Sequence, residues 1–384
     1  MKTLLKTALA VSLALAASDL LAKEADDDKS IFNSKTFESM KMRSIGPAYM
    51  SGRIADIEID QNNPSTWYTA VGSGGVWKTT NAGTTWTPIF DKQAVYSTGD
   101  VTIDPNNSNI IWVGTGENNG GRHISFGDGI YKSLDGGKTW KNMGLKDSER
   151  ISDIIIHPTD SNTVWASVQG PLWSSGGERG LYKTTNGGET WKQVLKPEDE
   201  WTGVTSLLID PRNPDKLYAA TWSRQRSVAT YVGTGPGAGI HTSDDGGETW
   251  TELKTGLPEG NMGKIGMAIS PMNPDVLYAT IETDNRKGGF YRSENRGASW
   301  TKVSDEVGGG TGPHYYQEIF ADQHQFDRVY IASNYSKVSD DGGKTWTPIN
   351  TKRKHVDDHA FAFHPTDPDF VLIGSDGGIY MSHD

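Results

Sequence analysis

The sequence contains no cysteine, which excludes a disulfide-stapled fold, a thiol nucleophile, a thiolate metal site and a lipid-modified cysteine. After its N-terminal segment it also lacks any apolar run of the roughly 20 residues that a membrane-spanning helix requires. Basic residues are in the minority, with 37 Lys and Arg against 48 Asp and Glu and a formal net charge of -11. An acidic surface repels a polyphosphate, so nucleic acid is not expected as a partner.

The N-terminal segment has the pattern of a secretory signal peptide. Lys2 and Lys6 flank a short apolar core, and small residues follow it. We therefore expect residues 1–22 to be removed and the protein to be periplasmic or extracellular. Residues 23–36 include three consecutive Asp and have little to bury, which predicts a solvated linker. The folded domain is expected over residues 37–384.

A motif of eight residues, [ST]-x-[DN]-x-G-x-[ST]-W, occurs six times, for example as TTNAGTTW and SDDGGKTW. Its tryptophans are Trp86, Trp140, Trp191, Trp250, Trp300 and Trp346. They lie 46 to 59 residues apart, and a period near 50 is typical of a propeller or a solenoid. A second phrase, usually Asp-Pro or His-Pro followed by a β-rich run, raises the number of units to seven.

Each unit is predicted to contain four short strands. In the first unit these are residues 53–60, 66–72, 76–80 and 85–90. Four-stranded antiparallel units that close radially predict an all-β, seven-bladed β-propeller. The seventh unit stops before its fourth strand, and we expect Phe37 to Ser44 to complete it. The alternative is that the chain is the N-terminal part of a longer protein.

The eight-residue motif resembles the Asp box, or BNR repeat, of sialidases, xyloglucanases and sortilin-type propellers. Longer stretches such as RSIGPAYMSGRI are similar to large bacterial secreted proteins of sortilin-like or glycosyl-hydrolase-like type. The resemblance covers residues 43–384 and implies the propeller fold. The motif itself is interpreted as structural, because Asp or Asn accepts backbone hydrogen bonds in a turn, Gly adopts positive φ and Trp packs between sheets. A functional site is therefore expected on the opposite face.

On that face the loops between second and third strands are long in several units, and such loops commonly carry binding residues. Their arginines can bind a carboxylate, and their aromatic rings can stack on a sugar or a peptide side chain. The predicted ligand-binding residues are Arg53, Arg122, His123, Trp173, Trp222, Arg224, Arg226, Tyr315, His355 and His359. The expected partner is a peptide, a protein or a carbohydrate. The competing interpretation is that these side chains are solvated or paired with neighbouring carboxylates.

A glycosidase would need two carboxylates about 5 to 10 Å apart, for which Glu117, Asp357 and Asp376 are candidates. In the xyloglucanases that the repeat resembles, a catalytic Asp follows the second strand of the first blade, and the second acid comes from a second propeller. This chain has Gly72 at the first of these positions. Neither that catalytic pair nor the Arg triad and Tyr nucleophile of sialidases transfers residue by residue.

His355, Asp357 and His359 alternate along a predicted strand, where two His and a carboxylate could bind zinc or iron. Polar residues at the start of an inner strand also commonly bond across the central channel, and no metal or cofactor is predicted. The first interpretation is a sortilin-like module that binds a ligand or partner protein. The alternative is a xyloglucanase-like or sialidase-like glycoside hydrolase.

Overall fold

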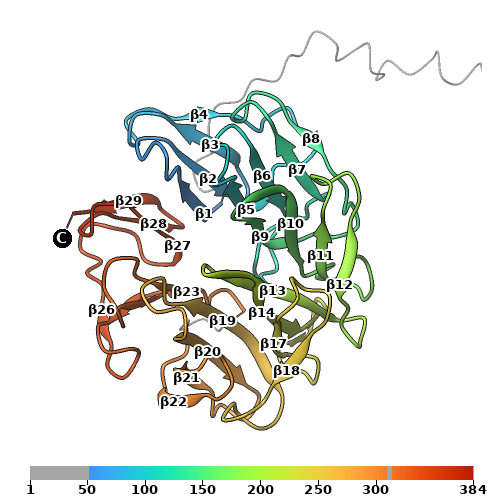
Figure 1. Cartoon of the computed structure of the whole chain (residues 1–384), viewed down its shortest axis with the longest axis vertical. Helices are drawn as coiled ribbons and strands as arrows, with labels where there is room; N and C mark the ends of the chain where they lie inside the picture. Colours follow the sequence, from blue (N-terminus) through green and yellow to red (C-terminus); the bar gives the residue numbers. More distant parts are fainter. Residues whose placement is uncertain (1–51, 309–313, 384) are drawn as a thin grey trace, which may run out of the picture. The chain divides into compact units, whose positions relative to one another are not determined.

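The computed structural model describes residues 52–308 and 314–383, all within one compact unit, Gly46–Asp384. The regular elements of these residues are β-strands, with no helix among them. They form six four-stranded sheets, one three-stranded sheet and a two-stranded hairpin, with antiparallel pairing throughout. The sheets stand around a common centre (Figure 1), which confirms the predicted all-β, seven-bladed propeller.

The blades follow one another in chain order. Blade 1 contains β1 (Ile54–Ile59), β2 (Trp67–Val71), β3 (Gly75–Thr79) and β4 (Thr87–Pro88). Blade 2 contains β5 (Thr98–Ile103), β6 (Ile111–Thr115), β7 (Ile130–Ser133) and β8 (Lys141–Asn142). Blade 3 contains β9 (Ile151–His157), β10 (Asp160–Val168), β11 (Gly180–Thr184) and β12 (Lys192–Leu195). Blade 4 contains β13 (Thr202–Asp210), β14 (Asn213–Ser223), β17 (Gly239–Ser243) and β18 (Thr251–Leu253). The hairpin β15 (Gln225–Arg226) and β16 (Tyr231–Val232) is inserted in blade 4.

Blade 5 contains β19 (Met262–Ile269), β20 (Leu277–Thr283), β21 (Gly289–Ser293) and β22 (Thr301–Ser304). Blade 6 contains β23 (Ile319–Ala321), β24 (Val329–Ile331), β25 (Lys337–Ser339) and β26 (Thr347–Pro348). Blade 7 contains β27 (Asp358–Phe363), β28 (Val371–Ser375) and β29 (Gly378–Ser382). The first strand of each blade lies nearest the centre, as Figure 1 shows for β1, β5 and β9. We call the face on which these inner strands begin the mouth.

The hydrophobic core lies between neighbouring blades. Second strands such as β2 (WYTAV) and β6 (IWVGT) are buried along their whole length, because each is covered by a blade on both sides. Trp67 of blade 1 packs in one cluster with Phe370 and Leu372 of blade 7, so these two blades share a core. Burial of such side chains contributes roughly 1.5 to 3 kcal/mol each, and the core therefore holds the ring together blade by blade.

The eight-residue motif forms the turn between the third and fourth strands. In blade 4 the Thr249 N–H donates to Asp245 Oδ1 at 2.9 Å, and the Gly247 N–H donates to Ser243 Oγ at 2.8 Å. The motif tryptophan can also join two blades, since the Trp191 indole N–H of blade 3 donates to the Met143 carbonyl of blade 2 at 2.9 Å. These contacts give the motif a structural role at the face opposite the mouth.

In blade 7 the described residues provide three strands, and β29 pairs there with β28 alone. The segment Phe37–Ser44, the signal peptide at 1–22 and the linker at 23–36 lie outside the described residues, so these remain predictions. The described part of the chain has no helix long and apolar enough to span a membrane.

Candidate functional site

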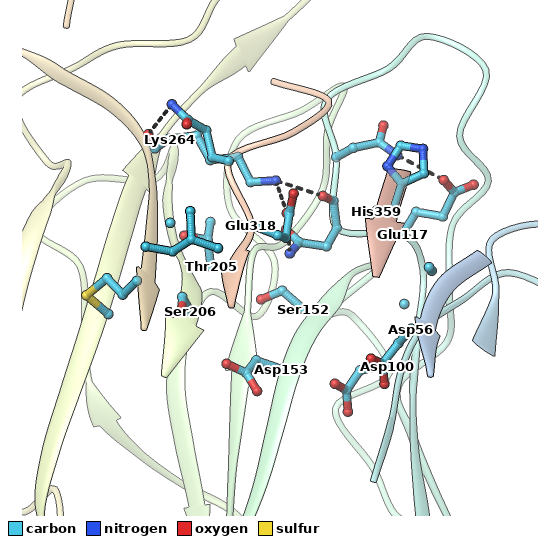
Figure 2. Close-up of a pocket in the computed structure, with 18 of the residues that line it drawn as sticks. Asp56, Asp100, Glu117, Ser152, Asp153, Thr205, Ser206, Lys264, Glu318 and His359 are labelled. Atoms are coloured by element: carbon cyan, nitrogen blue, oxygen red, sulfur yellow. Dashed lines mark hydrogen bonds and ion pairs between the residues drawn. The ribbon is translucent and has the colours of Figure 1, made fainter. Parts of the chain in front are cut away.

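A cavity of about 290 Å³ lies within the ring of inner strands, on the mouth side of the propeller. It is lined by residues of β1, β5, β9, β13, β19, β23 and β27, together with the loop that follows β6. Figure 2 shows its labelled polar residues, with Asp56, Asp100 and Asp153 deeper in the ring than Glu117, Lys264 and Glu318. Its walls are therefore rich in charged and hydroxyl groups.

A charged group centred on Arg53 forms one side of the mouth. Arg53 precedes β1 and makes ion pairs with Glu117, which follows β6, and with Asp376 Oδ1, which follows β28, at 3.3 Å. It also donates to His123 Nε2, and His359 Nε2 lies 2.9 Å from the same Asp376 oxygen. The group therefore joins predicted site residues from blades 1, 2 and 7.

The electrostatics of this group follow from burial and from the guanidinium charge. Burial opposes ionisation of Asp376, but the His359 contact and the Arg53 charge outweigh it and lower the pKa of that carboxyl. Burial, with the Arg53 charge added, lowers the pKa of His123. At neutral pH the group therefore presents an ionised Asp376 beside a neutral His123.

Glu117 fills the space next to Gly72. A Cβ placed on Gly72 would lie 2.5 Å from Glu117 Cδ and 2.7 Å from its Oε1. Gly72 directly follows β2 of blade 1, and its counterpart in blade 2 is Gly116, one residue before Glu117. A carboxylate from the neighbouring blade thus fills the space beside Gly72.

The loop after β6 crosses the mouth and is held by distant blades. The Lys264 ammonium, on blade 5, donates to the Asn118 carbonyl at 3.1 Å and pairs with Glu318 of blade 6. The Asn118 amide donates to Glu318 Oε1 at 3.2 Å, and the Gly120 N–H donates to the His314 carbonyl at 2.8 Å. These bonds fix the loop over the cavity.

Aromatic rings form a continuous row beside this loop, which we call the aromatic row: Tyr231, His314, Tyr315, Tyr316, His123 and His359. Ring centroids lie 4.7 Å apart for Tyr231 and His314, and 4.6 Å apart for His314 and Tyr315. His123 stacks on Tyr315 at 5.9 Å, and His359 stacks on Tyr316 at 5.2 Å. Aromatic rings with a few polar groups beside them are typical of ligand-binding pockets.

Deeper in the cavity three inner strands each place an aspartate. Asp56 accepts the Val101 N–H at 3.0 Å and Asp153 accepts the Leu207 N–H at 2.8 Å, so each bonds the inner strand of the next blade. Burial raises the pKa of Asp56 to about 6 and that of Asp153 to about 7. Burial and the charges of these two neighbours raise the pKa of Asp100 well above its usual value.

The other predicted residues differ in how accessible they are. Arg122 is exposed and the Trp173 side chain is 44% exposed, so both face solvent at the mouth. Trp222, Arg224 and Arg226 are buried within blade 4. Trp222 belongs to β14, which runs further than the sequence indicated, and its indole N–H donates to the Gly233 carbonyl at 2.8 Å.

The alternating His355, Asp357 and His359 have separate partners. His355 is exposed and contacts the Val356 carbonyl, Asp357 accepts the Tyr316 hydroxyl at 2.7 Å, and His359 contacts Asp376. Asp357 has a φ of 65°, so the segment is not the extended strand that would align the three side chains. Within the described residues no cluster of three or more His, Asp or Glu is placed to hold a metal ion.

Several residues of the site were not singled out from the sequence. Lys264 and Glu318 carry no local pattern and are recognised only by their contacts across the ring. Asp56, Asp100 and Asp153 do share a signal, since each lies between a small residue and an aliphatic one in the repeated pattern ADI, GDV and SDI. That repetition could have identified them as equivalent positions of three blades.

Comparisons with known proteins agree with this architecture. A xyloglucanase from Paenibacillus sp is 24% identical over 339 residues, which cover 78% of this chain and 31% of that protein. A probable oligoxyloglucan-reducing end-specific xyloglucanase from Neosartorya fischeri is 24% identical over 276 residues, covering 64% of this chain and 30% of that protein. The chain thus spans about a third of the length of these relatives.

Among solved structures, an ancestral GH74 enzyme matches with a TM-score of 0.65 and 21% identity, covering 87% of this chain and 45% of that one. YCF48 from Cyanidioschyzon merolae matches with a TM-score of 0.55 and 17% identity, covering 87% of this chain and 95% of that one. At these identities the structures bear on the fold alone. The family model described as sortilin, neurotensin receptor 3, matches residues 128–264 and 288–384, more than half of the sequence. The chain therefore belongs to the Sortilin-Vps10 family.

Proposed function

We propose that the mouth of this propeller binds a neutral, xyloglucan-like oligosaccharide, and that Glu117 is the carboxylate that faces the glycosidic bond. The observation that carries the proposal is the Glu117 carboxyl group packed against Gly72, the position at which the resemblance to xyloglucanases places a catalytic Asp. The curated relatives are xyloglucanases, which supports a carbohydrate ligand in preference to the peptide or protein favoured from the sequence. Export from the cell remains part of the proposal.

The aromatic row and the Arg53 group have different roles in binding the oligosaccharide. Tyr315 lines the cavity beside Glu117, so its ring can face a sugar while the carboxylate faces the bond between two sugars. Arg53 contacts both Glu117 and Asp376, and together with His359 it lowers the pKa of Asp376. An ionised Asp376 can act as a base or stabilise positive charge, Glu117 is held by the same guanidinium, and cleavage would require a further group that donates a proton.

The test measures binding first and cleavage second. We expect xyloglucan oligosaccharides to bind the purified chain in isothermal titration, and any cleavage to appear as new reducing ends on chromatography. Glu117→Gln is expected to reduce cleavage at least a hundredfold while changing affinity by less than about threefold, because general base catalysis is worth about 10²- to 10⁴-fold. Glu248→Gln, at the blade 4 turn with Lys183 and Lys192, is the matched control.

A double variant that moves the carboxylate from residue 117 to residue 72 tests the proposed role of Glu117 more directly. The double change Gly72→Asp with Glu117→Gly restores a carboxylate on blade 1 and removes the side chain that would collide with it. Recovery of the activity lost in Glu117→Gln would support the proposed role. Absence of oligosaccharide binding, or binding of a peptide library in its place, would overturn the proposal in favour of the sortilin-like interpretation.

A further inference from the structure

Three guanidinium groups are buried together at the mouth end of blades 3 and 4. Arg150 precedes β9, Arg179 precedes β11 and Arg224 follows β14, so all three lie where these strands meet the mouth. Their exposed fractions are 1%, 4% and 2%. Burial lowers the pKa of Arg224 well below its usual value, and the charges of Arg150 and Arg179 lower it further, which means that the three groups are electrostatic neighbours.

These charges have little compensation among the described residues. Arg150 pairs with Glu149 at 2.7 Å, and this is the one ion pair that the three arginines make there. Arg179 donates to backbone carbonyls, including those of Gly176 and Trp201 at 2.8 and 3.2 Å. The charges of Glu117 and Asp199 also attract Arg150 and Arg179, but neither carboxylate pairs with them directly. Buried charges are normally paired or neutralised, so three guanidiniums with one direct carboxylate partner leave charge that a further anion could balance.

Two of the three groups also retain donor capacity. Arg150 Nε is buried and has no hydrogen-bond partner in the described part of the chain. Among residues 52–308 and 314–383, Arg224 donates to the Asn119 and Gly170 carbonyls alone, at 3.4 and 3.2 Å. Bonds from a guanidinium to a carboxylate are commonly about 2.7 to 2.9 Å and frequently bidentate, so an anion could replace these long contacts with stronger ones.

We propose that Arg150 and Arg224, with Arg179 adding its charge, bind the carboxylate of an acidic sugar such as a uronic acid. A sugar is preferred over a peptide end because aromatic rings flank the group. The buried Trp222 ring packs 5.2 Å from the Arg224 guanidinium, and the exposed Trp173, in the same 169–179 loop whose carbonyls Arg179 binds, is the ring that can face a sugar. The proposed site uses residues other than Glu117, and it does not require the role assigned to that residue.

The experiment compares the melting temperature of the full chain in sodium D-glucuronate and in D-glucose, with ionic strength held equal by sodium chloride. A ligand that binds the native state raises the melting temperature. We expect a rise with glucuronate and none with glucose. Arg150→Gln and Arg224→Lys are expected to weaken glucuronate binding at least tenfold. Arg212→Gln is the control, since Arg212 pairs with Asp210 and Asp275 at the β13–β14 turn on the opposite face.

Three outcomes would contradict the proposed glucuronate site. A shift no larger than that of sodium chloride, or an equal shift in the arginine variants, would overturn it. So would stabilisation by N-acetyl-dialanine, which carries a free carboxylate on a peptide, without stabilisation by glucuronate.

If Arg150→Gln loses its cooperative transition, Arg150→Lys is the substitute variant. It keeps the charge and removes the Nε donor, and it is expected to bind glucuronate more weakly as well. Glu248→Gln, which lies at a turn on the opposite face, should leave the glucuronate shift intact.

Discussion

Asp153→Asn is expected to stabilise the propeller at pH 8 and to have little effect at pH 4. The folded protein raises the pKa of Asp153 from 3.8 to about 7, chiefly by burial and also through the charge of Asp56. A shift of roughly three pKa units corresponds to about 4 kcal/mol. Asn keeps an oxygen that can accept the Leu207 N–H, now 2.8 Å from Asp153, while it removes the buried charge.

The sign of the stability change at each pH follows from comparing the protonation of Asp153 in the folded and unfolded chain. At pH 8 the Asp153 carboxyl is ionised whether the chain is folded or unfolded, so the full electrostatic cost of folding is present. As the pH falls through 7 the folded protein takes up the proton first, and the cost decreases until about pH 4, where the unfolded carboxyl is protonated too. We therefore expect a stabilisation of about 2 to 4 kcal/mol at pH 8 and below about 1 kcal/mol at pH 4.

Urea unfolding of the wild type and the variant at the two pH values measures this difference. Asp245→Asn is the control, because hydrogen bonds from Thr249 lower the pKa of Asp245 to about 2 and keep it ionised at both pH values. Its effect on stability should be nearly the same at pH 8 and at pH 4. An Asp153→Asn variant that is destabilised equally at both pH values would refute the reasoning, since its hydrogen bond would then outweigh its charge.

Three further changes test the fold. Gly343→Ala is expected to cost about 1 to 3 kcal/mol in urea unfolding, because its φ is 90° and an added Cβ would lie 2.2 Å from a Phe290 ring carbon. Trp165→Phe removes the buried bond from the indole N–H to the Gly246 carbonyl of blade 4, 3.1 Å long, and should lower stability by about 1 to 3 kcal/mol, whereas an unchanged midpoint would contradict that estimate. Deletion of residues 30–46 should abolish the cooperative melting transition if that segment supplies the last strand of blade 7; an unchanged melting curve would disprove the strand assignment.

The repeat made the fold predictable because its information is local. Each motif turn is built within eight residues, and the two repeated phrases together give the blade count without any knowledge of contacts across the ring. The limits of individual strands were less certain. Trp222 was placed in a loop, but β14 continues to Ser223 and buries that ring, because the end of β14 still pairs with Thr202 and Gly203 of β13.

The candidate site was predictable only in part, because it depends on contacts between distant blades. Arg53 and Asp376 are 323 residues apart, and Lys264 and Asn118 are 146 apart. The long loop of the second unit placed His123 at the mouth, and the starts of the inner strands placed Arg53 and His359 there, yet nothing in the sequence paired Lys264 with Glu318. The conformation of the loop after β6 decides those pairings, and it is set by the ring as a whole.

Gly72 and Glu117 show how one blade of a propeller can place a side chain in the space of its neighbour. The loops that follow the second strands of blades 1 and 2 lie side by side at the mouth, so a side chain from blade 2 can enter the space that blade 1 leaves open. Glu117 does so because Gly72 has no Cβ, which at 2.5 Å from the Glu117 carboxyl carbon would exclude it. Under the proposed function, a carboxylate on residue 72 and one on residue 117 would occupy nearly the same space. The two residues must therefore be exchanged together to test whether the position of the charge, and not the residue that carries it, determines function.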